Sequence, residues 1–192
     1  MTADLVARHR AALDVASAYV ARVTDEDLRR RTPCAAWDLG QLLDHMVGQH
    51  AGFATVVRAG VAGAEAYEPQ PFTPASWCRS VDELVDAFAG ADLAAEVVEI
   101  ELHPTRPLPV SVLVQAQFLD TVVHTWDVAA ALGERFDPGT VIAAAVEAIA
   151  APIPDDARRD APGAAFAHAV PTGDATWDRT LGLLGRDPDW HR

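Results

Sequence analysis

The chain has 192 residues, of which half are hydrophobic and 22% are charged, a composition that indicates a folded globular protein rather than a disordered one. Its formal net charge is −13, and every basic residue other than histidine is arginine. Binding to DNA or RNA depends on basic patches that neutralise phosphates, so this balance argues against a nucleic-acid-binding protein. The length predicts one domain over residues 1–192 that buries its own core without a structural metal.

The cysteine content and the apolar pattern exclude further classes of protein. Two cysteines, Cys34 and Cys78, form neither a disulfide framework nor a structural zinc site. The N-terminus lacks a basic start followed by an unbroken apolar run, and no stretch reaches the roughly 18 apolar residues of a membrane span. We therefore expect a cytoplasmic protein of bacterial type with no membrane or nucleic-acid partner.

The first half of the chain predicts three helices. Apolar residues at helical spacing indicate an amphipathic helix over residues 4–23 and a second helix that Asp38 caps and that ends at Gly60. Gly48 and Gly52 lie one turn apart in the second helix, which is typical of close packing or of a local bend. Glycines and prolines predict a loop over residues 61–78. The S-x-x-E pattern that begins at Ser80 predicts a capping box and a third helix that ends near residue 97.

The second half is organised around a long helix over residues 115–133, for which Gly133 provides the expected C-terminal stop. A further helix is predicted over residues 140–151. Residues 152–192 indicate a mostly irregular extension with one short helix over residues 179–184. Only residues 96–102 suggest a strand, so the predicted class is all-α.

The long helix carries the side chains that indicate chemistry. Asp120 and His124 lie one turn apart and about 40° apart around the helix, which suits two ligands of one ion. The alternative is a surface carboxylate beside a histidine. Apolar residues surround this pair and predict burial, and buried polar groups need partners. His45, in the middle of the second helix, is the expected third ligand, because bundles build metal sites from facing helices. It is alternatively a core histidine with its own hydrogen-bond partners.

Neighbouring residues have more open roles. His50 lies about 140° around the helix from His45 and is expected outside the ligand set, as a pocket or surface residue. Asp127 either orients His45 or His124 by a hydrogen bond or forms an ion pair with an arginine such as Arg22 or Arg31. Cys34 is expected to pack near the start of the second helix, where a thiol without a base is a weak nucleophile.

Three blocks of sequence resemble a known family. They are T-P-C-x-x-W-D-L-x-x-L-L-D-H over residues 32–45, D-x-V-V-H-x-W-D-x-A-x-A-x-G over residues 120–133, and L-L-G-R-D-P-x-W over residues 183–190. Together they are similar to bacterial metal-binding proteins of the DinB-like superfamily, and most to the N-terminal domain of mycothiol-dependent maleylpyruvate isomerase. The resemblance implies a four-helix bundle with long connections, a C-terminal tail packed on the bundle, and one divalent metal held by His45, Asp120 and His124. The family more often has Glu at the position of Asp120, so the shorter side chain either brings the ion nearer the helix or acts through a water molecule.

Two histidines and one carboxylate with open positions suit catalytic zinc, and Ni(II), Fe(II) or Mn(II) are compatible by ligand type. The resemblance favours zinc with mycothiol as a thiol cosubstrate. The resulting hypothesis is a metal-dependent thiol S-transferase or isomerase that activates a thiol, or water, for attack on a small electrophilic metabolite. The alternative is a metal-binding or stress-related protein without catalysis. The sequence leaves open whether the protein is a homodimer.

Overall fold

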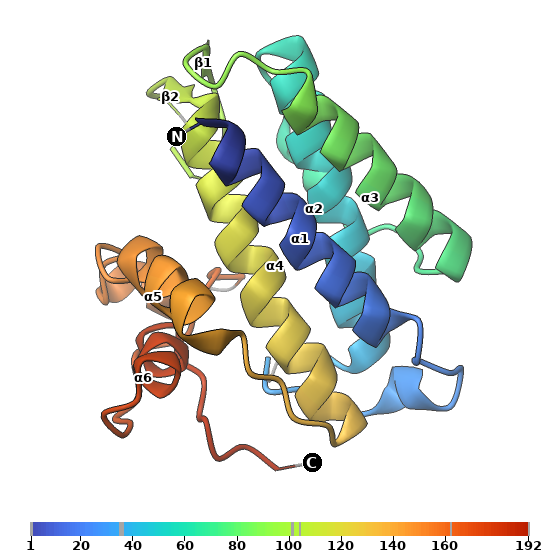
Figure 1. The fold of residues 1–192 in the computed structure, drawn as a ribbon, viewed down its shortest axis with the longest axis vertical. Coiled ribbons are helices and arrows are strands. Elements are labelled where there is room, and N and C mark those ends of the chain that lie inside the picture. The colour runs from blue at the N-terminus through green and yellow to red at the C-terminus, as the bar shows by residue number, and fades with distance from the viewer. Residues whose placement is uncertain (1, 35–36, 101, 104, 162, 192) are drawn as a thin grey trace.

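A computed structural model describes residues 2–34, 37–100, 102–103, 105–161 and 163–191. Four long helices lie side by side: α1 (Thr2–Val20), α2 (Leu39–Ala59), α3 (Pro74–Ala89) and α4 (Val110–Leu132) (Figure 1). An ion pair between Arg22 and Glu134 joins the C-terminal ends of α1 and α4. The Trp77 indole, at the start of α3, donates to Ser17 near the end of α1, so α3 runs opposite to α1. The predicted all-α bundle is confirmed.

Shorter elements connect and cover the bundle. Single turns of 3-10 helix occur at η1 (Asp27–Arg29), η2 (Ala64–Tyr67) and η3 (Ala157–Asp160). The strands β1 (Glu96–Val97) and β2 (Leu108–Pro109) pair in antiparallel fashion just before α4, with Val97 opposite Leu108. Helices α5 (Gly139–Ala150) and α6 (Thr176–Leu183) pack together beside α4 (Figure 1). Within the described ranges, no helix has both the length and the apolar character that crossing a membrane requires.

Local signals explain where α2 and α4 begin and end. The Asp38 side chain accepts a hydrogen bond from the Gln41 backbone, and the Gln41 side chain accepts one from the Asp38 backbone, so a complete capping box starts α2. Gly60 and Gly133 end α2 and α4 with φ angles of 82° and 76°, a left-handed conformation that costs glycine little. The predicted cap and both predicted ends are confirmed.

The structure corrects five predicted boundaries. Helix α3 begins at Pro74, where Thr73 and Ser76 form the capping box, so the predicted start at Ser80 and the loop prediction for residues 74–78 are wrong. Ser80 instead lies buried inside α3, which ends at Ala89 rather than near residue 97. Helix α4 starts five residues before the predicted position, and α6 starts at Thr176 rather than at residue 179. Strand β1 covers only two of the seven residues that suggested a strand.

The apolar core consists of three clusters, each of which includes residues of α4. One part of it joins α4 to α1, α2 and α3 near the β strands, and another joins α4 to α5 and to Leu184 at the end of α6. The latter contact confirms that the C-terminal segment packs on the bundle. The predicted close approach at Gly48 and Gly52 is also confirmed, because a Cβ at Gly52 would meet the Tyr67 ring and one at Gly48 would meet the Glu68 backbone.

Candidate metal centre

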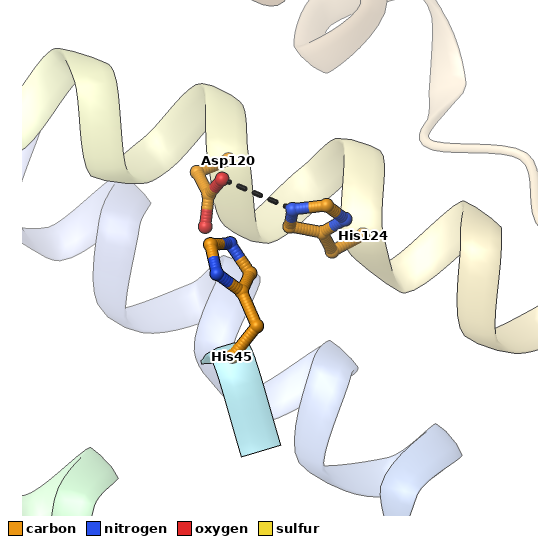
Figure 2. Close-up of side chains that lie close together, drawn as sticks. All are labelled: His45, Asp120 and His124. Carbon is orange, nitrogen blue, oxygen red and sulfur yellow. Dashed lines mark ion pairs between the residues drawn. The ribbon is translucent and has the colours of Figure 1, made fainter. Parts of the chain in front are cut away.

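His45, Asp120 and His124 meet between α2 and α4, and we refer to them as the trio (Figure 2). One ligand atom of each lies within 4.8 Å of those of the other two, and among the described residues no other three His, Cys, Asp or Glu side chains meet in this way. Asp120 Oδ1 lies 3.2 Å from His124 Nε2. The structure thus brings together the three residues that sequence spacing and resemblance suggested.

The trio has the donor atoms that a divalent cation needs. Asp120 Oδ2 is shielded from solvent and has no hydrogen-bond partner among the described residues. Burial lowers the pKa of His45, and the nearby His124 lowers it further, to about 4, so His45 is neutral near pH 7. A neutral imidazole and a carboxylate are the ligand forms of these side chains. The arrangement therefore suits a metal ion by chemistry as well as by spacing.

His124 differs from His45 in its charge. Burial lowers its pKa, but the charges of Asp120 and Asp127 and their hydrogen bonds outweigh burial and raise the pKa to about 9. For Asp120, burial raises the pKa, but the interaction with His124 outweighs burial and lowers the pKa to about 2. Without a cation, His124 therefore carries a proton at neutral pH and pairs with Asp120. A metal ion would take the place of this proton, since metal ligands must be deprotonated.

Asp127 lies directly behind His124. Its Oδ2 atom is 2.8 Å from His124 Nδ1, and the Asp127 side chain is fully buried. This contact fixes the ring so that Nε2 points toward the other two members of the trio. Hydrogen-bond partners behind metal-bound histidines orient those rings in the same way. The first predicted role of Asp127, a hydrogen bond that orients His45 or His124, is therefore found for His124.

Arg186 is the cation that balances Asp127. Its Nη2 atom donates to Asp127 Oδ2 at 3.0 Å, its Nε atom lies 3.2 Å from both carboxylate oxygens, and its Nη1 atom donates to the Leu184 carbonyl. The second predicted role of Asp127, an ion pair with an arginine, is thus also found, but the partner is Arg186 and not Arg31 or Arg22, which pairs with Glu134. The available signal for Arg186 was the third sequence block, in which this arginine stands between a glycine and an aspartate.

Other predicted residues fall around the trio. The Trp37 ring lies against the His45 ring, with centroids 4.4 Å apart, so it packs beside the trio as well as in the bundle. His50 is outside the trio, as predicted, but it is completely buried, so a surface position is wrong. Burial raises the pKa of the Cys34 thiol to about 11, with a further contribution from Asp127, which agrees with the prediction of a weak nucleophile.

A cavity of about 780 Å³ lies elsewhere, between the end of α4, α6 and the last residues of the chain. Its walls include Trp126, Phe136, Trp177 and Trp190, and none of the trio lines it. Size alone supplies no reactive group, whereas the trio combines converging ligand atoms with a buried orienting carboxylate. We therefore place the candidate chemistry at the trio.

Comparisons with known proteins identify a family for most of the chain. Residues 9–129, which include the whole trio, match the family model described as the mycothiol maleylpyruvate isomerase N-terminal domain. Two uncharacterized proteins of Mycobacterium tuberculosis, MT0763 of strain CDC 1551 and Rv0738 of strain H37Rv, are each 27% identical over 146 residues. That alignment covers 70% of this chain and 70% of each relative. No solved structure gives a significant match.

Proposed function

The chain belongs to the family of the mycothiol maleylpyruvate isomerase N-terminal domain, and we propose that it is a metal-dependent enzyme whose divalent ion is held by His45, Asp120 and His124. The observation that carries this proposal is the meeting of three ligand atoms within 4.8 Å at a place where a buried carboxylate orients one of the rings. When bound, such an ion lowers the pKa of a coordinated thiol or water and supplies a nucleophile near neutral pH.

The surrounding residues hold the ligands in position. Asp127 accepts the Nδ1 proton of His124 and leaves Nε2 for the ion, while Arg186 keeps Asp127 charged and fixed. The pKa of Asp127 supports this role: burial raises it, but the Arg186 charge and the contact with His124 outweigh burial and hold it below the usual range. Trp37 restricts the movement of the His45 ring and limits water on that side.

We further propose zinc as the ion. Three protein ligands with an open position are typical of catalytic zinc sites. Ni(II), Fe(II) and Mn(II) are compatible with the same ligands, and competition between these ions at equal concentration would rank them. Asp120 has one methylene fewer than glutamate, so an ion bound to it would lie closer to α4.

The proposed substrates are a low-molecular-weight thiol, with mycothiol as the leading candidate, and a small electrophilic metabolite. The thiol is supported by the description of the family. In this proposal the thiol gives its proton to solvent and its sulfur forms a bond to the electrophilic carbon. In S-transfer a leaving group departs from that carbon with its electron pair, as bromide departs from a bromoalkyl electrophile. In isomerisation the carbon–carbon double bond of the metabolite becomes a single bond when sulfur adds, rotates, and forms again when the thiol leaves.

A conjugation assay tests this function. Zinc-loaded protein is incubated with mycothiol and monobromobimane, and the fluorescent conjugate is measured against the rate without protein. We expect acceleration that is lost in His124→Ala and kept in Asp82→Asn, which removes an exposed charge of α3 outside the trio. Cysteine in place of mycothiol tests the choice of thiol. Bound zinc without any acceleration would contradict thiol transfer and leave a metal-binding protein without this catalysis.

A further inference from the structure

Four polar side chains lie inside the bundle next to the trio, and we call them the interior polar cluster. They are His9 of α1, His50 of α2, and Gln117 and Thr121 of α4, each no more than 1% exposed. Five of their atoms have no hydrogen-bond partner among the residues that the structure describes: His9 Nε2, His50 Nε2, Gln117 Oε1, Gln117 Nε2 and Thr121 Oγ1. Burying such an atom without a partner destabilises the folded state. Five unpartnered polar atoms in one core indicate a bound group that satisfies them.

These side chains come from three helices, of which α1 and α2 both pack against α4. Gln117 and Thr121 are one turn apart on the same face of α4, and Asp120 stands between them in sequence. His9 responds electrostatically to His50, and both histidines respond to the charge of Asp120. His50 also responds to His45. The interior polar cluster is therefore a neighbour of the trio, contributed by three helices.

The hydrogen bonds of His50 define what it offers. The Ser80 hydroxyl donates its only proton to the Trp77 carbonyl, so Ser80 Oγ accepts from His50 Nδ1, 3.0 Å away. His50 is then the Nδ1–H tautomer, and its Nε2 atom is a free acceptor. Burial lowers the pKa of His50 to about 4 and that of His9 to about 3, which keeps both rings neutral. No positive charge therefore belongs to the cluster.

This chemistry selects the bound group. An anion would find neutral rings and the negative charge of Asp120, without a buried cation among the four side chains to compensate. A second metal ion is also disfavoured, because His9, His50 and Asp120 do not bring three ligand atoms together. Gln117 and Thr121 both donate and accept, and His50 accepts. A neutral group that does the same, such as a hydroxyl or water, satisfies all of them.

We propose that His9, His50, Gln117 and Thr121 form a binding site for a neutral hydroxyl-type group, which is either ordered water or a hydroxyl of a small molecule that reaches past the trio. This site goes beyond the proposed metal function and does not depend on it, because none of the four residues belongs to the trio. Experiments on metal-free and zinc-loaded protein in parallel separate the two proposals.

The first test is the stability of the double variant Gln117→Leu, Thr121→Val, which removes three of the five unpartnered atoms at similar volume. A bound group loses its partners in this variant, so we expect a lower melting temperature than in wild type. If the polar atoms are simply unsatisfied, their removal stabilises the protein. An unchanged or higher melting temperature would therefore contradict the proposal. Thr125→Val is the matched control, since its hydroxyl is already bonded to the Thr121 carbonyl.

The second test identifies the source of the group and guards against a purely steric loss of stability. Oxygen-17 relaxation dispersion counts long-lived internal waters, and an ethylene glycol titration is followed by the ring NMR signals of His9 and His50. Long-lived waters that disappear in the double variant indicate water. A saturable glycol shift that disappears in the double variant indicates a ligand hydroxyl. If wild type shows neither long-lived waters nor a saturable glycol shift, the proposal is overturned, whatever the melting temperatures.

Discussion

Asp127 is the residue on which the geometry of the candidate centre depends most. It is fully buried, it holds the ring of His124, and its charge is balanced by Arg186 from the far end of the chain. A buried carboxylate without its cation is costly, because the charge then stays in a medium that solvates it poorly. Asp127 and Arg186 therefore act as one unit.

Removing Arg186 should expose this cost. In Arg186→Met we expect a loss of about 3–5 kcal/mol in the free energy of unfolding, since Asp127 is left buried and unpaired. Urea denaturation monitored by circular dichroism measures it. Arg158→Met is the control, because Arg158 pairs with Asp156 on the surface and should change stability little. Equal stability losses in the two variants would refute the role given to Arg186.

The two cysteines should react at very different rates. Burial raises the pKa of Cys34 to about 11, whereas Cys78 is exposed on α3. The thiolate is the reactive form, so iodoacetamide near pH 8 should modify Cys78 well before Cys34. Peptide mass spectrometry over time gives both rates, and the gap should close in urea. Faster modification of Cys34 in the folded protein would show that its surroundings differ from those described.

At the scale of elements, sequence signals succeeded where the controlling interactions are local. The cap at Asp38 and the glycine at position 133 act within one turn, so both helix ends were predictable. The start of α3 was not, because Thr73 followed by Pro74 and Ser80 followed by Glu83 both offer caps. The structure uses the first, which places Ser80 inside the helix where His50 needs a partner.

The residues of the candidate centre also differ in how far local sequence signals predict them. Asp120 and His124 were found from spacing along one helix, and His45 from its apolar surroundings and the family resemblance. Arg186 lies 59 residues from Asp127, and the contact depends on how the tail returns to α4. His9 and Gln117 were missed because a single polar residue on an apolar helix face carries no pattern of its own.

Close packing of α2 on η2 gives a prediction for this element. Alanine normally stabilises a helix by about 1 kcal/mol relative to glycine. At position 48, however, the added Cβ would meet the Glu68 backbone, which cannot move aside as a side chain does. Gly48→Ala should therefore lower stability by about 1–3 kcal/mol. Thr55→Ala, on the exposed side of the same helix, is the control, and a stabilised Gly48→Ala in thermal unfolding would contradict this packing.

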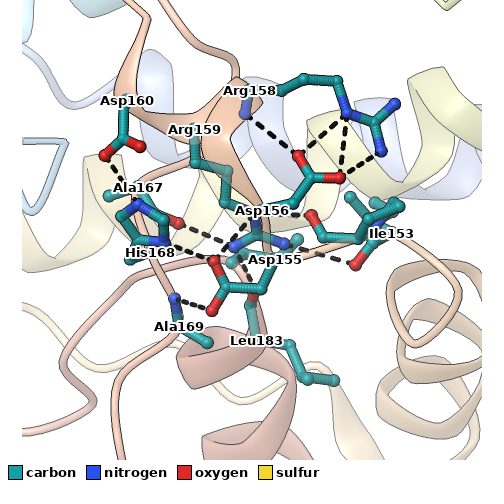
Figure 3. A network of polar contacts seen from close by, with 12 residues as sticks. Ile153, Asp155, Asp156, Arg158, Arg159, Asp160, Ala167, His168, Ala169 and Leu183 are labelled. Carbon is teal, nitrogen blue, oxygen red and sulfur yellow. Dashed lines mark hydrogen bonds and ion pairs between the residues drawn. The ribbon is translucent and has the colours of Figure 1, made fainter.

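The segment around η3 is held by a polar network (Figure 3). His168 lies between two carboxylates, with Nδ1 2.5 Å from Asp155 Oδ1 and Nε2 2.9 Å from Asp160 Oδ1. Arg159 donates to the Ala167 and Leu183 carbonyls and so ties the segment to the end of α6. Part of this network depends on the charge of His168.

Its pH dependence is therefore predictable. Hydrogen bonds to Asp160 and Asp155 raise the pKa of His168 above its ordinary value of 6.5. A raised folded-state pKa stabilises the protein fully below the ordinary value, and the stabilisation is lost as pH rises through the raised pKa. The Ala169 amide donates to Asp155 Oδ2, 3.1 Å away. Hydrogen exchange of this amide, corrected for the intrinsic rate, should therefore show less protection on the alkaline side. His168→Gln should remove this dependence, and an unchanged dependence in that variant would assign it to another group.

At the scale of the whole molecule, α4 connects the bundle to the C-terminal segment. Asp120 and His124 of α4 face His45 of α2. Asp127 of α4 meets Arg186, which follows α6. Apolar residues of α4 contact α5. A net charge of −13 gives the surface little affinity for polyanions, which agrees with a small-molecule substrate rather than a nucleic acid.

The most direct test of the proposed metal centre is the metal content of the purified protein after zinc loading and dialysis. Inductively coupled plasma mass spectrometry measures it. We predict about one ion per chain in wild type, and loss of the ion in His45→Ala, Asp120→Asn and His124→Ala. His168→Ala, which removes an exposed histidine outside the trio, should keep its ion, and so should Asp120→Glu. Circular dichroism confirms that each variant is folded. A wild type that binds no ion, or folded trio variants that keep it, would contradict the proposed metal centre.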